Sequence, residues 1–227
     1  MVKHHPTPEL LASFSAGSLS LSYALCIATH LEYCSDCQTN VHRLKSLGAD
    51  MFSRQKPAPV SDDFKRRIFD QLDNEAKPQA VEAEVATLKP VAKTEANLVP
   101  RPLRKLVPES YDQLDWHSVA PAIKSAALCR DGERTQVSMM KLMPGAQVGH
   151  HRHLGEEITL VLDGSFSDEE GIYQQGDFIL RDSKHKHKPV ASKDGPCICL
   201  TVQDAPIQFT GFLARLFNPF MRRSYGI

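Results

Sequence analysis

The sequence has no excess of charge of either sign. It carries 27 basic and 27 acidic residues among 227. Proteins that hold nucleic acid by its phosphates carry clustered positive charge, and this balance lacks that electrostatic footprint. We therefore expect no direct contact with nucleic acid, and any role in gene expression would act through another protein.

Long apolar runs are also missing. No stretch approaches the about 20 apolar residues of a membrane-spanning helix. The first ten residues, MVKHHPTPEL, have neither an apolar signal core nor a small-residue cleavage site. These absences predict a cytoplasmic protein with no membrane contact. In that reducing compartment the six cysteines should stay thiols rather than form three disulfides.

The cysteines that are present occur mostly in close pairs. Cys34 and Cys37 form a CxxC, and Cys197 and Cys199 form a CxC. In a reducing compartment such pairs are more often metal ligands or redox groups than structural bridges. The other two cysteines stand alone in apolar surroundings, so we expect them to be small buried hydrophobes.

The first 75 residues have apolar residues at helical spacing. Capping residues and this period predict four helices, over about residues 8–16, 20–33, 35–51 and 61–75. The segment that follows is rich in Ala, Glu, Lys and Pro, with no aromatic residue, which is typical of a linker.

Beyond this linker the apolar period changes to two. Short β-branched runs such as EEITLVLDGSFSD and CICLTVQD are separated by turns rich in Gly, Pro and Asp. Several short strands at regular spacing favour a small all-β barrel or jelly roll. The sequence therefore predicts a multidomain α and β protein with an all-α domain at 1–75, a linker at 76–104 and an all-β domain at 105–227.

The stretch GHHRHLGEE packs three imidazoles and two carboxylates into nine positions of the β half. Residues two apart in a strand point to one side, so His151 and His153 should face the barrel interior together. Glu157 begins the next strand, and His187 or His185 from another strand would complete the set. Such a site suits zinc, iron, manganese or copper. The alternative is an exposed polar strand face.

The longer stretch GAQVGHHRHLGEEITLVLDG resembles the cupin superfamily. It has the spacing of the first cupin motif without a gap, at Gly145, His151, His153, Glu157 and Gly164. The resemblance implies a double-stranded β-helix barrel over about residues 105–210. In the second motif the usual Pro and Gly are absent. His187 is favoured over His185 as the fourth ligand because it stands at the last position of that motif.

A second cluster lies in the helical half. The stretch THLEYCSDCQ places His30 and Cys34 one helical turn apart and Cys37 three residues further on. Two thiolates and an imidazole favour tetrahedral zinc. The fourth ligand must come from elsewhere, and we expect His5; in the alternative, both nearby histidines lie in a flexible terminus. A thioredoxin-like role is not favoured because no βαβ pattern surrounds the CxxC.

An N-terminal His followed by HxxxCxxC between two helices is similar to the zinc-binding anti-sigma domains. This resemblance implies an extracytoplasmic-function sigma factor as the partner, which such domains keep from core RNA polymerase. Followed by a cupin domain, it resembles the two-domain zinc anti-sigma factors of the singlet-oxygen response over almost the whole chain. It implies two metal sites, the second holding zinc or another divalent ion: His5, His30, Cys34 and Cys37, and His151, His153, Glu157 and His187. It also suggests a redox role for Cys197 and Cys199.

The fourth predicted helix has an apolar face with few partners in so small a domain: Phe64, Ile68, Phe69 and Leu72. We expect this face to dock into a sigma-factor groove as an amphipathic helix. The equal alternative is an ordinary core face. The predicted function is an anti-sigma factor that releases its sigma factor when the cupin domain senses singlet oxygen or related oxidative stress.

Two other functions remain open from the sequence. Many cupins with three His and one Glu are metal-dependent enzymes such as dioxygenases, but a simple oxygenase has no use for the fused helical module. A metal storage or chaperone protein fits the two sites but not the apolar helix. The sequence therefore favours a regulator that is not an enzyme.

Overall fold

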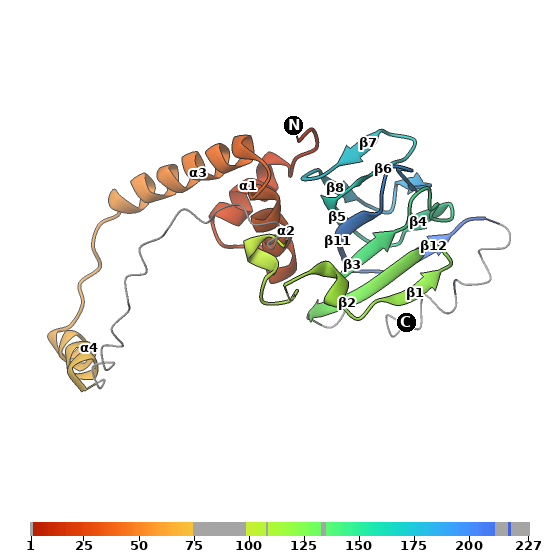
Figure 1. Ribbon diagram of the computed structural model, residues 1–227. Coiled ribbons are helices and arrows are strands. Elements are labelled where there is room, and N and C mark those ends of the chain that lie inside the picture. Colours follow the sequence, from red (N-terminus) through yellow and green to blue (C-terminus); the bar gives the residue numbers. More distant parts are fainter. Residues whose placement is uncertain (1, 75–98, 108, 133–134, 212–217, 219–227) are drawn as a thin grey trace, which may run out of the picture.

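The computed structural model describes residues 2–74, 99–107, 109–132, 135–211 and 218 (Figure 1). A helical part is followed by a β-rich part, as the sequence predicts. The helices of the first part lie at Pro8–Ser15 (α1), Leu21–Leu31 (α2), Ser35–Ser53 (α3) and Asp62–Asn74 (α4).

The ends of these helices follow from local capping. The Thr7 hydroxyl accepts a backbone N–H of α1 at 3.3 Å, and Pro8 occupies the first turn. Gly17, with a φ of +69°, follows the end of that helix. The Cys34 sulfur caps α3 by accepting the backbone N–H of Cys37 at 3.4 Å. The turn between α2 and α3 therefore holds the two cysteines of the CxxC together.

The β-rich part forms three antiparallel sheets. The largest has the strand order β1-β2-β3-β11-β5-β8, and the smaller ones have the orders β10-β6-β7 and β12-β4-β9. The strands lie at His117–Ala120 (β1), Ile123–Asp131 (β2), Thr135–Leu142 (β3), His151–His153 (β4), Glu157–Asp163 (β5), Ser165–Ser167 (β6), Ile172–Gln174 (β7), Phe178–Arg181 (β8), Lys186–His187 (β9), Val190–Ala191 (β10), Cys197–Gln203 (β11) and Ile207–Phe209 (β12).

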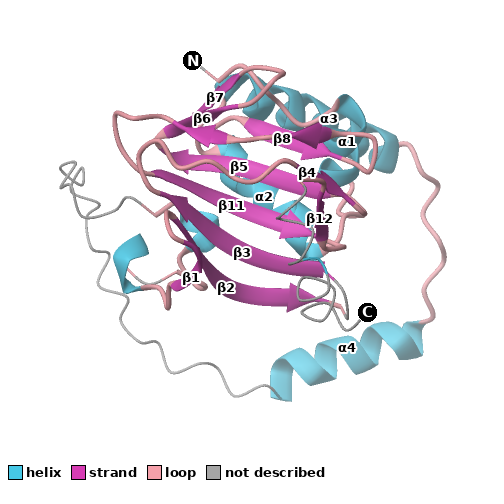
Figure 2. Cartoon of the chain, turned by 90° about the vertical axis from the view of Figure 1, so that its right-hand side faces the viewer, coloured by secondary structure: helices cyan, strands magenta, loops and turns pink. Residues whose placement is uncertain are grey.

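The large sheet is covered on both faces. Along β5, Leu160 and Leu162 pack in one core with Ile27 of α2, whereas Val161 packs in a second core with Phe166 of β6. Strand periodicity explains this alternation, because successive side chains point to opposite faces. The helices therefore lie on the outer face of the sheet, and the small sheets close a barrel over the inner face (Figure 2).

The helical and β-rich parts share one hydrophobic core. Ile27 of α2 is completely buried, in the same cluster as Leu160 of β5 and Leu200 of β11. Val99 and Leu103 are buried in this cluster as well, beside a 3₁₀ turn at Arg101–Leu103. The last residues of the predicted linker at 76–104 thus pack against α2, while residues 75–98 lie outside the described residues.

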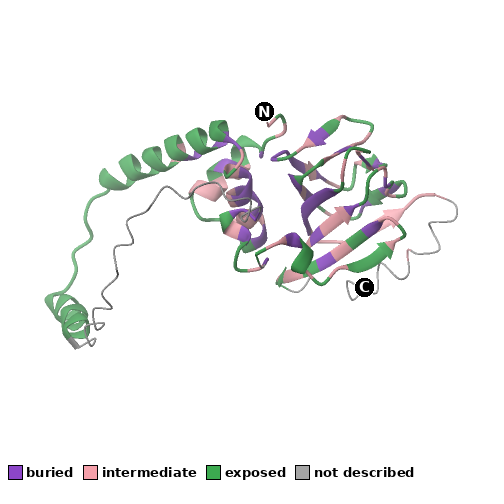
Figure 3. Cartoon of the chain, in the orientation of Figure 1, coloured by how far each residue is buried: buried purple, intermediate pink, exposed green. Residues whose placement is uncertain are grey.

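The end of α3 and all of α4 are exposed instead (Figure 3). On α4 the side chains named for partner binding have exposed fractions between 42% and 64%: Phe64, Ile68, Phe69 and Leu72. Within the described residues this face is therefore not buried in a core, and its docking to a partner stays a prediction. None of the described helices is both long and apolar enough to cross a membrane.

Candidate metal centres

The helical cluster brings together the four residues predicted for zinc. One ligand atom from each of His5, His30, Cys34 and Cys37 lies within 4.8 Å of all the others. The Nδ1 atom of His5 is 3.3 Å from the sulfur of Cys34 and 3.5 Å from that of Cys37. Zinc bonded tetrahedrally to sulfur and nitrogen separates its ligand atoms by roughly 3.3 to 3.8 Å. The arrangement therefore fits a four-coordinate zinc ion.

His30 is prepared for a metal by its surroundings. Its Nδ1 lies 2.8 Å from the carbonyl oxygen of Gly176, to which it donates as an N–H. That bond fixes the tautomer and leaves Nε2 as a free lone pair. Nε2 is buried and has no hydrogen-bond partner in the described structure. A buried nitrogen without a partner is costly unless a cation occupies the space that it faces.

The chemistry of the two thiols in this cluster also favours a bound cation. Burial, together with the neighbouring Cys34, raises the pKa of Cys37 to about 12. Two adjacent thiolates are therefore unfavourable without a cation between them. A bound divalent ion would lower the pKa of both thiols, because it stabilises their deprotonated forms directly.

The barrel cluster consists of three inward-facing histidines. His151 and His153 lie on β4, and His187 lies opposite His151 on β9. The Nε2 of His187 is 3.1 Å from the Nε2 atoms of both other rings. All three side chains are buried, while the intervening Arg152 is exposed. As predicted, His151 and His153 both point into the barrel interior, where they meet His187.

Each of these rings donates the N–H of its other nitrogen, Nδ1, to an oxygen atom. Nδ1 of His151 is 2.8 Å from the carbonyl oxygen of Gly149, Nδ1 of His153 is 3.0 Å from Glu157 Oε2, and Nδ1 of His187 is 3.0 Å from Asp168 Oδ2. Histidine ligands of metals are oriented in this way. Burial and the neighbouring His187 lower the pKa of His151 to about 4, so its imidazole is neutral at pH 7. The three Nε2 lone pairs therefore converge in the form that binds a metal.

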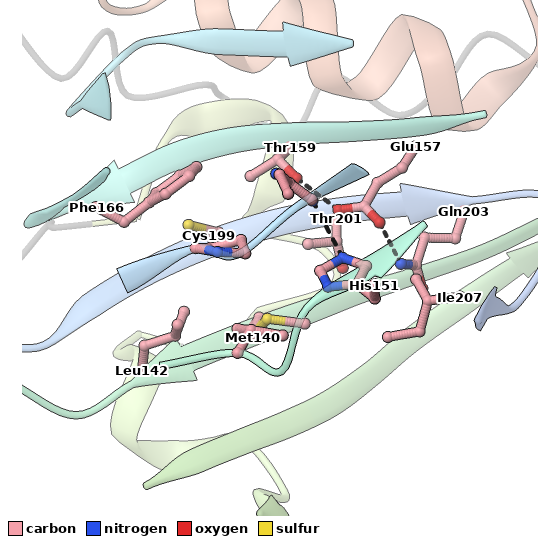
Figure 4. A pocket seen from close by; sticks show the side chains of 13 residues that line it. Met140, Leu142, His151, Glu157, Thr159, Phe166, Cys199, Thr201, Gln203 and Ile207 are labelled. Atoms are coloured by element: carbon pink, nitrogen blue, oxygen red, sulfur yellow. Dashed lines mark hydrogen bonds between the residues drawn. The ribbon is translucent and has the colours of Figure 1, made fainter. Parts of the chain in front are cut away.

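Glu157 lies beside this cluster rather than among its converging atoms (Figure 4). Its carboxylate accepts hydrogen bonds from Thr159 at 2.9 Å and from Gln203 at 2.5 Å, besides its contact with His153. Burial raises the pKa of Glu157, but the hydrogen bonds and His153 outweigh it and lower the pKa to about 2. The group of close ligand atoms found in the described residues contains the three histidines without Glu157. Its role as a ligand stays a prediction.

His185, the alternative fourth ligand, lies outside the cluster. Its Nδ1 is 2.7 Å from Asp182 Oδ1, and its side chain is about one-third exposed. The prediction of His187 rather than His185 as a ligand therefore agrees with the positions of the two side chains. The carboxylate that orients His187, Asp168, was not found by sequence reasoning, because it lies 19 positions earlier with no motif spacing to mark it.

A cavity of about 60 Å³ adjoins the barrel histidines. Its wall is mostly apolar, with Met140, Phe166 and Ile207 among the lining residues, and Cys199 also lines it. The sulfur atoms of Cys197 and Cys199 are 3.7 Å apart and buried. The hydrogen bond with Cys197 and burial raise the pKa of Cys199, so Cys199 is present as a thiol at neutral pH. Of the CxC motif, Cys199 therefore belongs to the wall of the cavity beside the barrel cluster, and Cys197 lies directly behind it.

A helical module with a His₂Cys₂ cluster, packed on a barrel with three converging histidines, defines a class of two-domain proteins with a cupin-like barrel and two candidate metal centres. Residues 107–206 match the family described as the ChrR cupin-like domain. The chain is 32% identical to the anti-sigma-E factor ChrR of Cereibacter sphaeroides, over 97% of this chain and 99% of that protein. It therefore belongs to the ChrR family of anti-sigma factors.

A solved structure supports the same relationship. It is that of Rhodobacter sphaeroides SigE in complex with the anti-sigma ChrR, with a TM-score of 0.73 and 27% sequence identity. The match covers 90% of this chain and 100% of the solved chain. Both the helical and the β-rich part are thus included in the similarity.

Proposed function

We propose that this protein is an anti-sigma factor that sequesters a SigE-type, extracytoplasmic-function sigma factor and releases it under oxidative stress. Its relative ChrR has been seen in complex with SigE, and the similarity to ChrR extends over 97% of this chain. The observation that carries the proposal is the large apolar surface that the helical part leaves exposed next to its metal cluster. The place of action would be the cytoplasm, where RNA polymerase works.

On α1 and α3 this surface has two portions, and the apolar face of α4 is a third. A groove of about 550 Å³ runs between α1 and α3 and is lined by Leu11, Leu44 and Leu47 beside the metal ligands His5 and Cys37. Beyond it, Met51 and Phe52 at the end of α3 are 59% and 81% exposed. Exposed apolar patches of this kind mark protein interaction sites. We assign the groove, the end of α3 and the apolar face of α4 to sigma binding.

The helical cluster would hold structural zinc. Four protein ligands leave no open position, which is the arrangement of structural rather than catalytic zinc. The ion would fix the N-terminal segment, the end of α2 and the start of α3 to one another. Because these elements border the groove, loss of zinc would deform the sigma-binding surface.

The barrel would be the sensor. Its three histidines suit zinc or another divalent ion with at least one position open to the cavity. A hydroperoxide that enters the cavity would transfer one oxygen atom to the thiol of Cys199, forming a sulfenic acid and leaving as an alcohol or water. Cys197, in contact with Cys199, is the second candidate for oxidation. Either change would alter the wall of the barrel cluster.

Co-expression with a SigE-type sigma factor tests this function. A stable one-to-one complex that blocks transcription by the sigma factor, and that dissociates after exposure to singlet oxygen or an organic hydroperoxide, supports it. The alternative function, a metal-dependent cupin dioxygenase, predicts turnover of small diketones or thiols by the metal-loaded chain. Turnover without sigma binding would contradict the proposal.

A further inference from the structure

One segment of the barrel touches both candidate metal centres. We call residues 168–178 the bridging segment; it contains β7 and the turns on either side of it. At its start, Asp168 orients His187 of the barrel cluster. At its end, Gly176 contacts His30 of the helical cluster, and Asp177 contacts the backbone of His4, next to the cluster residue His5. The two ends are therefore parts of two different sites.

Hydrogen bonds to the backbone join the barrel to the segment that precedes His5. Asp177, completely buried, accepts the backbone N–H of Lys3 at 2.7 Å and that of His4 at 3.0 Å. The backbone N–H of Phe178 donates to the carbonyl oxygen of His4 at 3.0 Å. Three hydrogen bonds thus hold the residues directly before the metal ligand His5 on the barrel.

The second ligand that the barrel holds is His30, through the carbonyl oxygen of Gly176. Gly176 has a φ of +89°, and a Cβ added there would lie 2.7 Å from Val2 and from Tyr33. The turn is therefore packed too closely against the helical part to move independently of it. Two of the four helical ligands are positioned by the barrel.

Side chains of the bridging segment connect these contacts to the barrel cluster. Asp168 accepts the hydroxyl of Tyr173 at 3.0 Å as well as Nδ1 of His187 at 3.0 Å. Arg181 donates to the Tyr173 hydroxyl at 2.6 Å. The ring of Tyr173 lies 4.7 Å from the ring of His4. A continuous path of contacts runs from His187 through Asp168 and Tyr173 to His4, the half-buried residue before His5.

We propose that Asp177 is a positioning residue for the helical metal cluster and that the bridging segment couples the two centres. A change at His187 shifts Asp168 and Tyr173, and with them the turn that holds His5 and His30. The proposal rests on the proposed function only in that both clusters bind metal. Groups that orient metal ligands typically change metal affinity by about 10- to 100-fold when removed.

The test uses Co²⁺ as the probe in the full-length chain. Co²⁺ bound to thiolates has a charge-transfer absorption that histidine ligands do not give. In a background with both Cys197→Ser and Cys199→Ser, the barrel cluster has no thiol beside it, and this absorption reports on Cys34 and Cys37. Asp177→Ala should weaken Co²⁺ binding at the helical cluster about tenfold or more, and Asp177→Asn, which keeps one acceptor oxygen, should restore part of the loss.

The matched control is Asp131→Ala. Asp131 also lies in the barrel and accepts a backbone N–H of the helical part, that of Ser22 at 2.7 Å, but at the other end of α2. It should leave Co²⁺ affinity within about twofold. Lys3→Pro removes one donor to Asp177 without a change in the barrel, and should weaken binding in a chain whose barrel is intact. If both Asp177→Ala and Lys3→Pro match the control, the positioning role is wrong.

Coupling is measured by a double-mutant cycle with His187→Ala. His187→Ala should change Co²⁺ affinity at the helical cluster at least threefold in the parent chain and have little effect in the Asp177→Ala chain. Equal effects in both chains, or no effect in either, would overturn the coupling. A parent chain that binds no Co²⁺ through its thiolates would contradict the helical metal site itself and the proposal with it.

Discussion

The apolar face of α4 allows a sharp test of sigma binding. Ile68→Asp combined with Phe69→Asp places two charges on a face whose side chains are 42% and 64% exposed in the free chain. Because both residues are already exposed, the free energy of unfolding and the zinc content should stay unchanged. The affinity for the sigma factor should fall, because a docked helix would bury these side chains.

The size of the loss follows from the exposed fractions. Full burial of such a side chain contributes about 1.5 to 3 kcal/mol, and roughly half of each surface remains to be buried on docking. The pair therefore loses about 2 to 3 kcal/mol, and the cost of burying charge adds to it. At 1.4 kcal/mol for each factor of ten, we expect binding to weaken about 100-fold or more.

Affinity is measured by titration of labelled sigma factor, and stability by thermal unfolding. Arg66→Glu is the control, because it changes the net charge by the same two units on the opposite side of the helix. That variant should lose much less affinity. If the Asp variant unfolds at lower temperature or loses zinc, its face belongs to a core; if its affinity stays within about threefold, α4 does not dock.

Other perturbations test the remaining parts of the structure. Cys37→Ser should remove zinc worth about 10 kcal/mol to the helical part and release the sigma factor, and a pull-down in which it still inhibits transcription would count against this. Asp168→Asn should lower the affinity of the barrel for zinc about 10- to 100-fold, read by calorimetry, whereas an unchanged affinity would show that His187 needs no orientation. Cys199→Ser should keep sigma binding but slow release by hydroperoxide, and normal release would exclude this thiol as the sensor. A fragment of residues 1–85 should melt at a lower temperature than the whole chain because Ile27 loses its partners; an equal melting temperature would contradict the shared core.

Local sequence rules predict much of this structure. Caps and apolar period place all four helices within about two residues of their observed ends. The strand period places His151 and His153 inside and His150 outside. The Cys34 and Cys37 pair follows from the break between two helices. These features succeed because each depends on residues only a few positions apart.

The packing of the helices on the barrel was missed, although the sequence carries a signal for it. A strand with one exposed face alternates, but β5 and β11 contain consecutive apolar residues, as in LVL and CICL. Unbroken apolar runs are typical of strands buried on both faces. The roles of Asp168 and Gly176 have no such signal. Gly176 acts on His30 across 146 positions, a contact that only the folded chain specifies.

The common core has a consequence for chimeras within this family. The outer faces of β5 and β11, α2 and the residues at 99–107 fit one another as a unit. A hybrid that joins the helices of one relative to the barrel of another, with a crossover in the intervening stretch, would set two mismatched surfaces together. Such a hybrid would need the sheet's helix-facing positions transplanted along with the helices. If the proposed sigma-binding surface is correct, we expect specificity for a new sigma factor to be exchanged more easily by substitutions at exposed positions of α3 and α4, which lie outside this core.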